Sequence, residues 1–268
     1  MGKKEDKAIL EERKRREAFD FFYSSIYQDR WIKLKEALLC ESTPVAFSEN
    51  LTKPYFLDKA SIIAASLLPL KDGDSILDMC AAPGGKTLVL ASRGKGNIFI
   101  SANDRSRDRK ARLDSVIAEY LSSDISSKIT TTCFDASRYG LYHKEEFDAV
   151  LLDAPCSSER HVLHSNKHMA MWSSSRPKRL AIEQFALLCS ALDSVKKGGY
   201  ILYSTCSINP KEDEAVIARL LERRSGLVKE VEVNSAYGEK KEHGYLVLPD
   251  VHDNLGPLYF ALLEKTNE

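Results

Sequence analysis

Residues Ser75 to Thr87 read S-I-L-D-M-C-A-A-P-G-G-K-T, a short apolar strand that runs directly into a glycine turn. An ordinary strand-to-helix turn needs one glycine, so two glycines after a proline favour a turn that lets a ligand approach the backbone. The helix that follows presents its N-terminus, where a negative group is stabilised. The residues expected to line this ligand site are Cys80, Ala81, Ala82, Pro83, Gly84, Gly85 and Lys86.

The same turn excludes two other nucleotide-binding motifs. A phosphate-binding loop of the G-x-x-x-x-G-K-[ST] type would require a glycine in place of Cys80. The dinucleotide fingerprint G-x-G-x-x-G is absent as well. Neither motif therefore explains the turn.

Short apolar segments alternate with helical ones around and beyond this turn. The expected strands are Ser75–Met79, Asn97–Ala102, Ile129–Cys133, Phe147–Leu152 and Tyr200–Ser204, and the expected helices are Lys86–Ala91, Ser106–Leu121 and Arg176–Val195. This alternation predicts a doubly wound α/β fold with a mostly parallel sheet, and an antiparallel strand near Leu258–Leu263. Ligands of such sheets bind at the carboxyl ends of the strands.

The first 50 residues differ in character from this region. Aromatic and apolar residues recur there at the helical period, so residues 4–40 are predicted to be helical, with an extended linker after them. We expect a helical extension over residues 1–50 and one large domain over residues 51–268. No apolar run reaches the roughly 18 residues of a membrane span, and the charged N-terminus does not resemble a signal peptide. We therefore expect a cytoplasmic protein.

Two further carboxylates follow predicted strands. Asp104 lies where a carboxylate can accept hydrogen bonds from both hydroxyls of a ribose. Asp135 follows the next strand and is placed to accept a hydrogen bond from an adenine amino group. The alternative for Asp104 is the N-cap of the next helix, a role that Asn103 or Ser106 can also fill.

Two cysteines end neighbouring strands of the predicted sheet. Cys156 closes D-A-P-C, residues 153–156, and Cys206 lies in S-T-C-S, residues 204–207. Carbon 5 of cytosine reacts poorly with a sulfonium methyl group, and a thiolate that adds to carbon 6 activates it. A carboxyl group near N3, for which Asp153 is placed, would stabilise the charge that forms. The second cysteine would help to remove the C5 proton or to release the enzyme.

Other arrangements of the six cysteines are not expected. They form no C-x-x-C pair, and a chain of this size without a secretion signal does not need a disulfide framework.

His161, His164 and His168 are closely spaced, but no carboxylate or thiolate accompanies them at metal-ligand spacing. We therefore expect no metal site.

A surface for nucleic acid must be local, because 39 basic residues balance 39 acidic ones. Residues 160–179 form such a patch, with basic residues, one tryptophan and no acidic residue. The candidate RNA contacts are Arg160, Lys167, Trp172, Arg176, Lys178 and Arg179. Basic side chains can contact phosphates, and an aromatic ring among them can stack on a base. The alternative is a solvated loop.

These motifs resemble the signatures of the NSUN (Sun/Fmu) family of RNA cytosine-5 methyltransferases. The similarity runs from about residue 55 to the C-terminus and includes P-C-S-S-E-R-H-V-L-H and L-V-L-P-D-V-H-D-N-L-G-P-L-Y-F. It is greatest to the branch that contains the mitochondrial small-subunit ribosomal RNA enzyme. The resemblance implies the class I methyltransferase fold and S-adenosylmethionine as cofactor, with ribosomal RNA as the expected substrate and transfer RNA as the alternative.

The resemblance also implies roles for single residues. The two glycines and the lysine of the turn would hold the methionine part of the cofactor, Asp104 the ribose and Asp135 the adenine, with Arg109 beside them. Cys206 would be the nucleophile, while Cys156 would assist product release and Asp153 would contact the target base. Many relatives carry a separate N-terminal RNA-binding domain, for which this chain has no room, and the mitochondrial relative works with a protein partner. The choice of target therefore stays open.

Two other functions remain to be distinguished. A DNA cytosine-5 methyltransferase uses the cysteine of a P-C motif as nucleophile, which would give Cys156 the leading role. A ribosome-assembly protein would keep the fold as an RNA-binding scaffold without catalysis. The T-C-S motif argues against the first alternative, and the intact set of candidate catalytic residues argues against the second.

Overall fold

Five parallel strands form the centre of the computed structural model, which describes residues 2–234, 236–252 and 254–267. They are β3 (Ser75–Asp78), β4 (Phe99–Asn103), β5 (Ile129–Thr132), β6 (Phe147–Asp153) and β7 (Val195–Thr205). Their order across the sheet is β5-β4-β3-β6-β7, so the chain reverses its direction of winding between β3 and β6. All five predicted strands are confirmed, and the doubly wound α/β fold with them. The glycine turn and D-A-P-C leave the sheet from the two strands that flank the reversal.

An antiparallel edge completes the sheet. β11 (Leu258–Lys265) pairs with β7, and β10 (Tyr245–Val247) with β9 (Glu239–Lys240) extends it further. β8 (Val228–Val231) also pairs with β11. The predicted late antiparallel strand is therefore confirmed, whereas the short strands β8 to β10 were not predicted.

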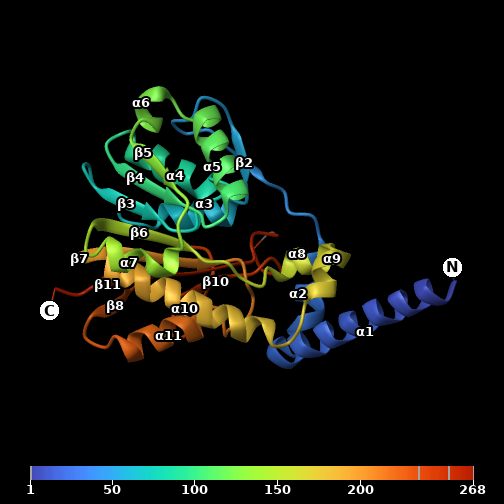
Figure 1. Ribbon diagram of the computed structural model, residues 1–268. Helices are drawn as coiled ribbons and strands as arrows, with labels where there is room; N and C mark the ends of the chain where they lie inside the picture. The colour runs from blue at the N-terminus through green and yellow to red at the C-terminus, as the bar shows by residue number, and fades with distance from the viewer. Residues whose placement is uncertain (1, 235, 253, 268) are drawn as a thin grey trace.

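Helices cover both faces of the sheet, as Figure 1 shows. One face packs against α3 (Lys59–Ser66), α4 (Gly85–Gly94) and α5 (Arg107–Tyr120), and the short α6 (Ser123–Ser126) lies beyond them. The other face packs against α7 (Tyr139–Tyr142), α10 (Arg176–Ser194) and α11 (Glu214–Arg223). Each layer has its own apolar core, and the sheet separates the two cores. Within the described residues, no helix is long and apolar enough to span a membrane.

The N-terminal extension consists of α1 (Gly2–Tyr27) and α2 (Arg30–Leu39), followed by a hairpin of β1 (Val45–Phe47) and β2 (Tyr55–Leu57). Phe19 and Tyr23 of α1 are fully buried and belong to the same apolar core as β6 and β7. The start of α1 projects away from the sheet in Figure 1, while its end packs beside α2. The extension is thus part of the folded body from about residue 19 onward.

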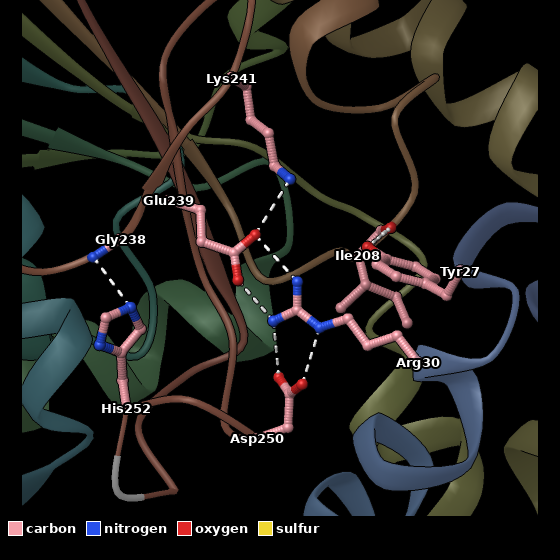
Figure 2. A network of polar contacts seen from close by, with 8 residues as sticks. All are labelled: Tyr27, Arg30, Ile208, Gly238, Glu239, Lys241, Asp250 and His252. Atoms are coloured by element: carbon pink, nitrogen blue, oxygen red, sulfur yellow. Dashed lines mark hydrogen bonds and ion pairs between the residues drawn. The ribbon is translucent and has the colours of Figure 1, made fainter.

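An arginine fork fixes this extension to the C-terminal part of the chain. Figure 2 shows the guanidinium of Arg30 between the carboxylates of Glu239 and Asp250, with nitrogen–oxygen distances of 2.5 to 3.0 Å. The hydroxyl of Tyr27 donates to the carbonyl of Ile208 at 2.6 Å. Two bidentate ion pairs on one guanidinium give a fixed geometry as well as attraction. Arg30 therefore holds the start of α2 against β9 and Asp250, and Tyr27 holds the end of α1 against the loop that follows β7.

The segment from 160 to 179 is mostly helical, which differs from the loop that the sequence analysis gave as the alternative to an RNA-binding patch. It forms α8 (Glu159–His164), α9 (Asn166–Met171) and the start of α10. Trp172 is only 6% exposed, and its ring lies 5.0 Å from that of Phe19 and 5.8 Å from that of Phe22. The predicted stacking of Trp172 on RNA bases is therefore wrong, because α1 covers the ring.

Candidate active site

The glycine turn is shaped by close packing. The Ala82–Pro83 peptide bond is cis, and Gly84 has a φ of +119°, a conformation that favours glycine. A Cβ atom on Gly84 would meet Val116 of α5 at 3.0 Å, and one on Gly85 would meet Tyr55 of β2 at 3.1 Å. The backbone conformation of Gly84 and the close packing around both residues therefore favour glycine in the turn, which opens α4 at Gly85.

The buried acid Asp78 contacts the first turn of the helix that follows the glycine turn. Thr87 donates to Oδ2 of Asp78 at 2.7 Å, while Oδ1 of Asp78 accepts no hydrogen bond in the described part of the chain. Burial raises the pKa of Asp78 to about 7, against the opposing effect of the Thr87 hydrogen bond. Asp78 was not predicted as a site residue, although its place at the end of β3 is a signal in the sequence.

A pocket of about 200 Å³ lies beyond the carboxyl ends of β3 and β4. Four predicted cofactor residues line it, namely Cys80, Asp104, Arg109 and Asp135. Other lining residues were not predicted, and they include Met79, Arg105, Ser137, Pro155 and Glu183. These residues come from loops and from α10, so their positions depend on long-range packing.

Asp104 is the best-placed cofactor ligand in this pocket. Its side chain is 2% exposed, and Oδ1 accepts a hydrogen bond from the amide of Ser106 at 2.9 Å. Oδ2 accepts no hydrogen bond from the described residues, and its polar neighbour is Nη2 of Arg109 at 3.3 Å. The N-cap of α5 is Ser106, so the alternative role for Asp104 is already filled. Oδ2 is therefore available for a hydroxyl group.

Arg109 and Asp135 have partners within the chain. Nη2 of Arg109 donates to the carbonyl of Ala82 at 2.5 Å and so ties the glycine turn to Asp104. Oδ1 of Asp135 accepts hydrogen bonds from the amide and the hydroxyl of Ser137 at 3.1 and 2.8 Å. Arg109 thus shapes the pocket, and Asp135 lies at its rim with one oxygen already engaged.

Two more pockets continue from the first. One of about 150 Å³ follows the turn and is lined by Cys80 to Pro83, Gly85, Lys86 and Asp153. The other, of about 640 Å³, shares Lys86 and Asp153 with it and is lined in addition by Cys206, Ser158 and Arg160. Cys80 lines both of the smaller pockets. The three pockets therefore form a series that begins at Asp104 and reaches Cys206.

A lysine and a carboxylate stand where the second and third pockets meet. Nζ of Lys86 lies 2.7 Å from Oδ2 of Asp153, and the hydroxyl of Ser204 donates to Oδ1 at 2.8 Å. Burial alone would lower the pKa of Lys86, but the charge and the hydrogen bond of Asp153, together with Cys206 and Asp78, outweigh burial and raise that pKa. Asp153 is thus held in one orientation next to the cysteines.

The two cysteines of the strand-end motifs are brought together. Their Sγ atoms lie 3.1 Å apart, and the hydroxyl of Ser158 lies 3.1 Å from Cys206 and 3.4 Å from Cys156. Cys206 is exposed, whereas Cys156 is partly buried. The hydrogen bond from Cys156 lowers the pKa of Cys206, and the same bond together with burial raises the pKa of Cys156. Cys206 is therefore the thiol that ionises first.

The predicted RNA contacts divide into two groups. Lys167, Lys178 and Arg179 are exposed, and Arg176 is partly exposed. Arg160 instead donates to the carbonyls of Ala37 and Gly256 and to Oδ1 of Asn254, and so it holds α2 and the loop before β11. Within that loop, Asp253 of the quoted C-terminal motif lies outside the described residues.

The three histidines do not assemble a metal centre. The rings of His161 and His168 lie 4.0 Å apart, and His164 is hydrogen-bonded to the carbonyl of Leu38. Among the described residues, no group of three or more histidine, cysteine, aspartate or glutamate side chains is arranged to hold a metal ion.

The chain is similar to several known proteins. Residues 65–264 match the family model of the 16S rRNA methyltransferases RsmB/F. The chain is 34% identical over 231 residues to the 5-cytosine rRNA methyltransferase NSUN4 of Bos taurus, which covers 80% of this chain and 60% of that protein. It is 30% identical over 226 residues to the mitochondrial tRNA (cytosine(34)-C(5))-methyltransferase of Mus musculus, which covers 81% of this chain and 65% of that protein.

A solved structure supports the fold. The crystal structure of PH0851 superimposes with a TM-score of 0.81 at 24% identity, covering 92% of this chain and 65% of that chain. This chain thus spans about 60% of the NSUN4 sequence and about two thirds of the two other proteins.

Proposed function

Because the chain belongs to the RsmB/F family of 16S rRNA methyltransferases, we propose that it transfers the methyl group of S-adenosylmethionine to carbon 5 of a cytosine in ribosomal RNA. The match to the family model confirms the resemblance of the motifs to this family. The cofactor of this family supplies an electrophilic methyl group on a sulfonium centre.

The residues of the first two pockets fit this cofactor. The buried Oδ2 of Asp104 accepts no hydrogen bond from the described residues, so it suits the hydroxyls of a ribose. The first turn of α4 offers backbone amides to a carboxylate, and Lys86 adds a positive charge beside it. These groups would hold the cofactor so that its reactive end faces the third pocket.

The third pocket supplies the chemistry at the base. The thiolate of Cys206 adds to carbon 6, and the electron pair so displaced makes carbon 5 nucleophilic toward the methyl group. Asp153 lies at the pocket edge, where it orients the base at N3. After transfer, a base removes the proton from carbon 5, and the bond between carbon 6 and Cys206 breaks. Cys156, 3.1 Å from the departing sulfur, is the group that assists this release.

One observation carries the assignment of roles. Cys206 is exposed and lines the third pocket together with Lys86 and Asp153, whereas Cys156 is partly buried and is not among the residues that line this pocket. A base in the pocket would therefore meet the sulfur of Cys206 first, which favours Cys206 as nucleophile. A DNA-type enzyme would need the sulfur of Cys156 in that place.

Incubation of the protein with radiolabelled S-adenosylmethionine and separate ribosomal and transfer RNA fractions tests the proposal. We expect label in the ribosomal fraction and loss of that label in Cys206→Ala. Bisulfite sequencing of cellular RNA with and without the gene then locates the cytosine. Label only in transfer RNA would favour the substrate of the murine relative, and no label in either would contradict the activity.

A further inference from the structure

Each of the two cysteines is followed in the sequence by a buried serine. Ser157, after Cys156, is 1% exposed, and Ser207, after Cys206, is fully buried. The cysteines belong to loops that leave different strands, β6 and β7. Hydrogen bonds that join these serines therefore also set the distance between the two thiols.

The carboxyl group of Glu212 makes that connection. Oε2 accepts from the amide of Ser157 at 2.9 Å and from Nε2 of Gln184 at 3.0 Å. Oε1 accepts from the hydroxyl of Ser157 and, at 3.3 Å, from the hydroxyl of Ser207. Glu212 is itself fully buried, and the hydroxyl of Tyr203 in β7 donates to its backbone carbonyl at 2.6 Å. The side chain of Glu212 thus makes hydrogen bonds to both cysteine loops, and its backbone is held by Tyr203.

Glu159 extends this network to the N-terminal extension. It is fully buried, and its Oε1 accepts from the hydroxyls of Tyr23 and Ser207 at 2.5 and 3.3 Å. Its Oε2 accepts from the amide of Ile208 at 3.1 Å. Helix α1 is therefore connected, through Tyr23 and Glu159, to the loop that carries Cys206.

We infer that Glu212 is a positioning residue that joins the Cys156 and Cys206 loops and so fixes the spacing of the two thiols. The inference rests on the proposed function, because it assigns no reaction of its own to this carboxyl group. Among the described residues Glu212 makes no hydrogen bond to either thiol, and its hydrogen bonds go to the serines next to them.

The electrostatics of the cluster agree with a role in hydrogen bonding. None of the ion pairs among the described residues involves Glu159 or Glu212, and Asp213 beside them is also buried. Burial and the neighbouring charge of Glu159 raise the pKa of Glu212 to about 7. A buried polar group without a cation is costly unless its hydrogen bonds are satisfied. An apolar side chain would be enough to fill the same space in the core. The buried carboxyl groups are therefore explained by the hydrogen bonds through which they hold the two cysteine loops.

The test measures the spacing of the thiols without RNA. Phenylarsine oxide binds two thiols at once, so its affinity reports whether Cys156 and Cys206 are within reach of one arsenic atom. Glu212→Ala removes the connection. Glu212→Gln is isosteric with the protonated acid, and its amide can serve the same partners because serine hydroxyls both donate and accept. Cys156→Ser gives the baseline of single thiols, and Glu222→Gln on the exposed surface of α11 is the matched control.

We expect Glu212→Ala to bind the arsenical at least about tenfold more weakly than the wild type, since a misplaced second thiol loses its effective concentration. In the methylation assay, kcat should fall while KM for RNA stays close to the wild-type value. Glu212→Gln should restore most of both quantities, and Glu222→Gln should not differ from the wild type. Thermal melting identifies the variants that are folded at the assay temperature.

A folded Glu212→Ala protein with wild-type arsenical affinity and kcat would overturn the inference, as would a Glu212→Gln protein that behaves like the alanine variant. If Glu212→Ala does not fold, Ser207→Ala takes its place, because it removes the hydroxyl shared by Glu159 and Glu212. Wild-type affinity in that variant would count equally against the inference. Tight arsenical binding by a wild-type protein that methylates no RNA would refute the proposed function and leave the positioning role in place.

Discussion

Replacement of Asp104 by asparagine separates the binding function of this residue from its structural function. Oδ1 accepts the amide of Ser106 at 2.9 Å, and an asparagine oxygen can keep that bond. Oδ2 is buried without a hydrogen bond in the described chain, its charged neighbour is Arg109 at 3.3 Å, and both residues line the pocket. Asp104→Asn therefore keeps the turn and removes the free acceptor together with its charge.

The magnitude follows from the one oxygen that is lost. A hydrogen bond to a charged group contributes about 1.5 to 3 kcal/mol, which corresponds to an affinity loss of about tenfold to 150-fold. The stability of the free protein should change little, because the charge interaction that is lost is the one with Arg109, which is half exposed, and such pairs contribute little. The loss should therefore appear in cofactor binding and be absent from the urea unfolding curve.

Isothermal titration calorimetry with S-adenosylmethionine measures this difference directly. Asp108→Asn, in the exposed first turn of α5, is the control with the same change of charge. We expect Asp108→Asn to bind like the wild type. Unchanged cofactor affinity in a folded Asp104→Asn protein would refute the role assigned to this carboxylate.

Two further predictions concern pH and salt. The pKa of Glu212 rises from 4.5 to about 7 on folding, so the folded state binds its proton more tightly and stability is lost as the pH rises between these values. This effect contributes up to about 3 kcal/mol to the free energy of unfolding. Urea unfolding at pH 5 and pH 8 should therefore show a smaller pH dependence of stability in Glu212→Gln than in the wild type. An equal pH dependence in the two proteins would contradict the assignment. For the basic patch, Lys178→Ala with Arg179→Ala should lower the salt slope of binding to single-stranded RNA by about 1.4, at about 0.7 for each phosphate contact. Lys71→Ala is the control, because this exposed lysine lies before the amino end of β3. An unchanged slope in the double variant would leave the patch without a role in binding.

The long buried strands were predictable because their pattern is local. β6 and the second half of β7 are apolar runs, and the β6 prediction ended within one residue of the observed strand. The first half of β7, which contains two lysines and two glycines, was not predicted as strand. β1 and β9 contain three and two residues, too few for a periodic pattern, and they were missed. Their strand conformation is set by the partner strands, which lie elsewhere in the sequence.

The site was predictable as a set of residues but not as a geometry. Cys156 and Cys206 meet because β6 and β7 pair with Asp153 opposite Ser204, a register that the sequence does not express locally. Trp172 was misassigned for a related reason. Its basic neighbours indicate a surface, whereas α1, about 150 positions earlier, supplies the rings that bury it. The carboxyl cluster beneath the cysteines was missed because Glu159 and Glu212 resemble exposed acids in sequence. The 1–50 and 51–268 division, the cytoplasmic location and the roles of single site residues stay predictions.

Trapping of the covalent protein–RNA adduct tests the central claim, that Cys206 attacks the base and Cys156 assists release. Cys206→Ala, Cys156→Ala and the double variant are incubated with cofactor and RNA that carries the target cytosine in a loop, and then separated on a denaturing gel. A loop nucleotide reaches the site more easily, because leaving a duplex stack costs a few kcal/mol. We expect a slowly migrating band for Cys156→Ala, since the bond between carbon 6 and Cys206 persists, and no band for the other two variants. A band that requires Cys156 and persists in Cys206→Ala would contradict the account.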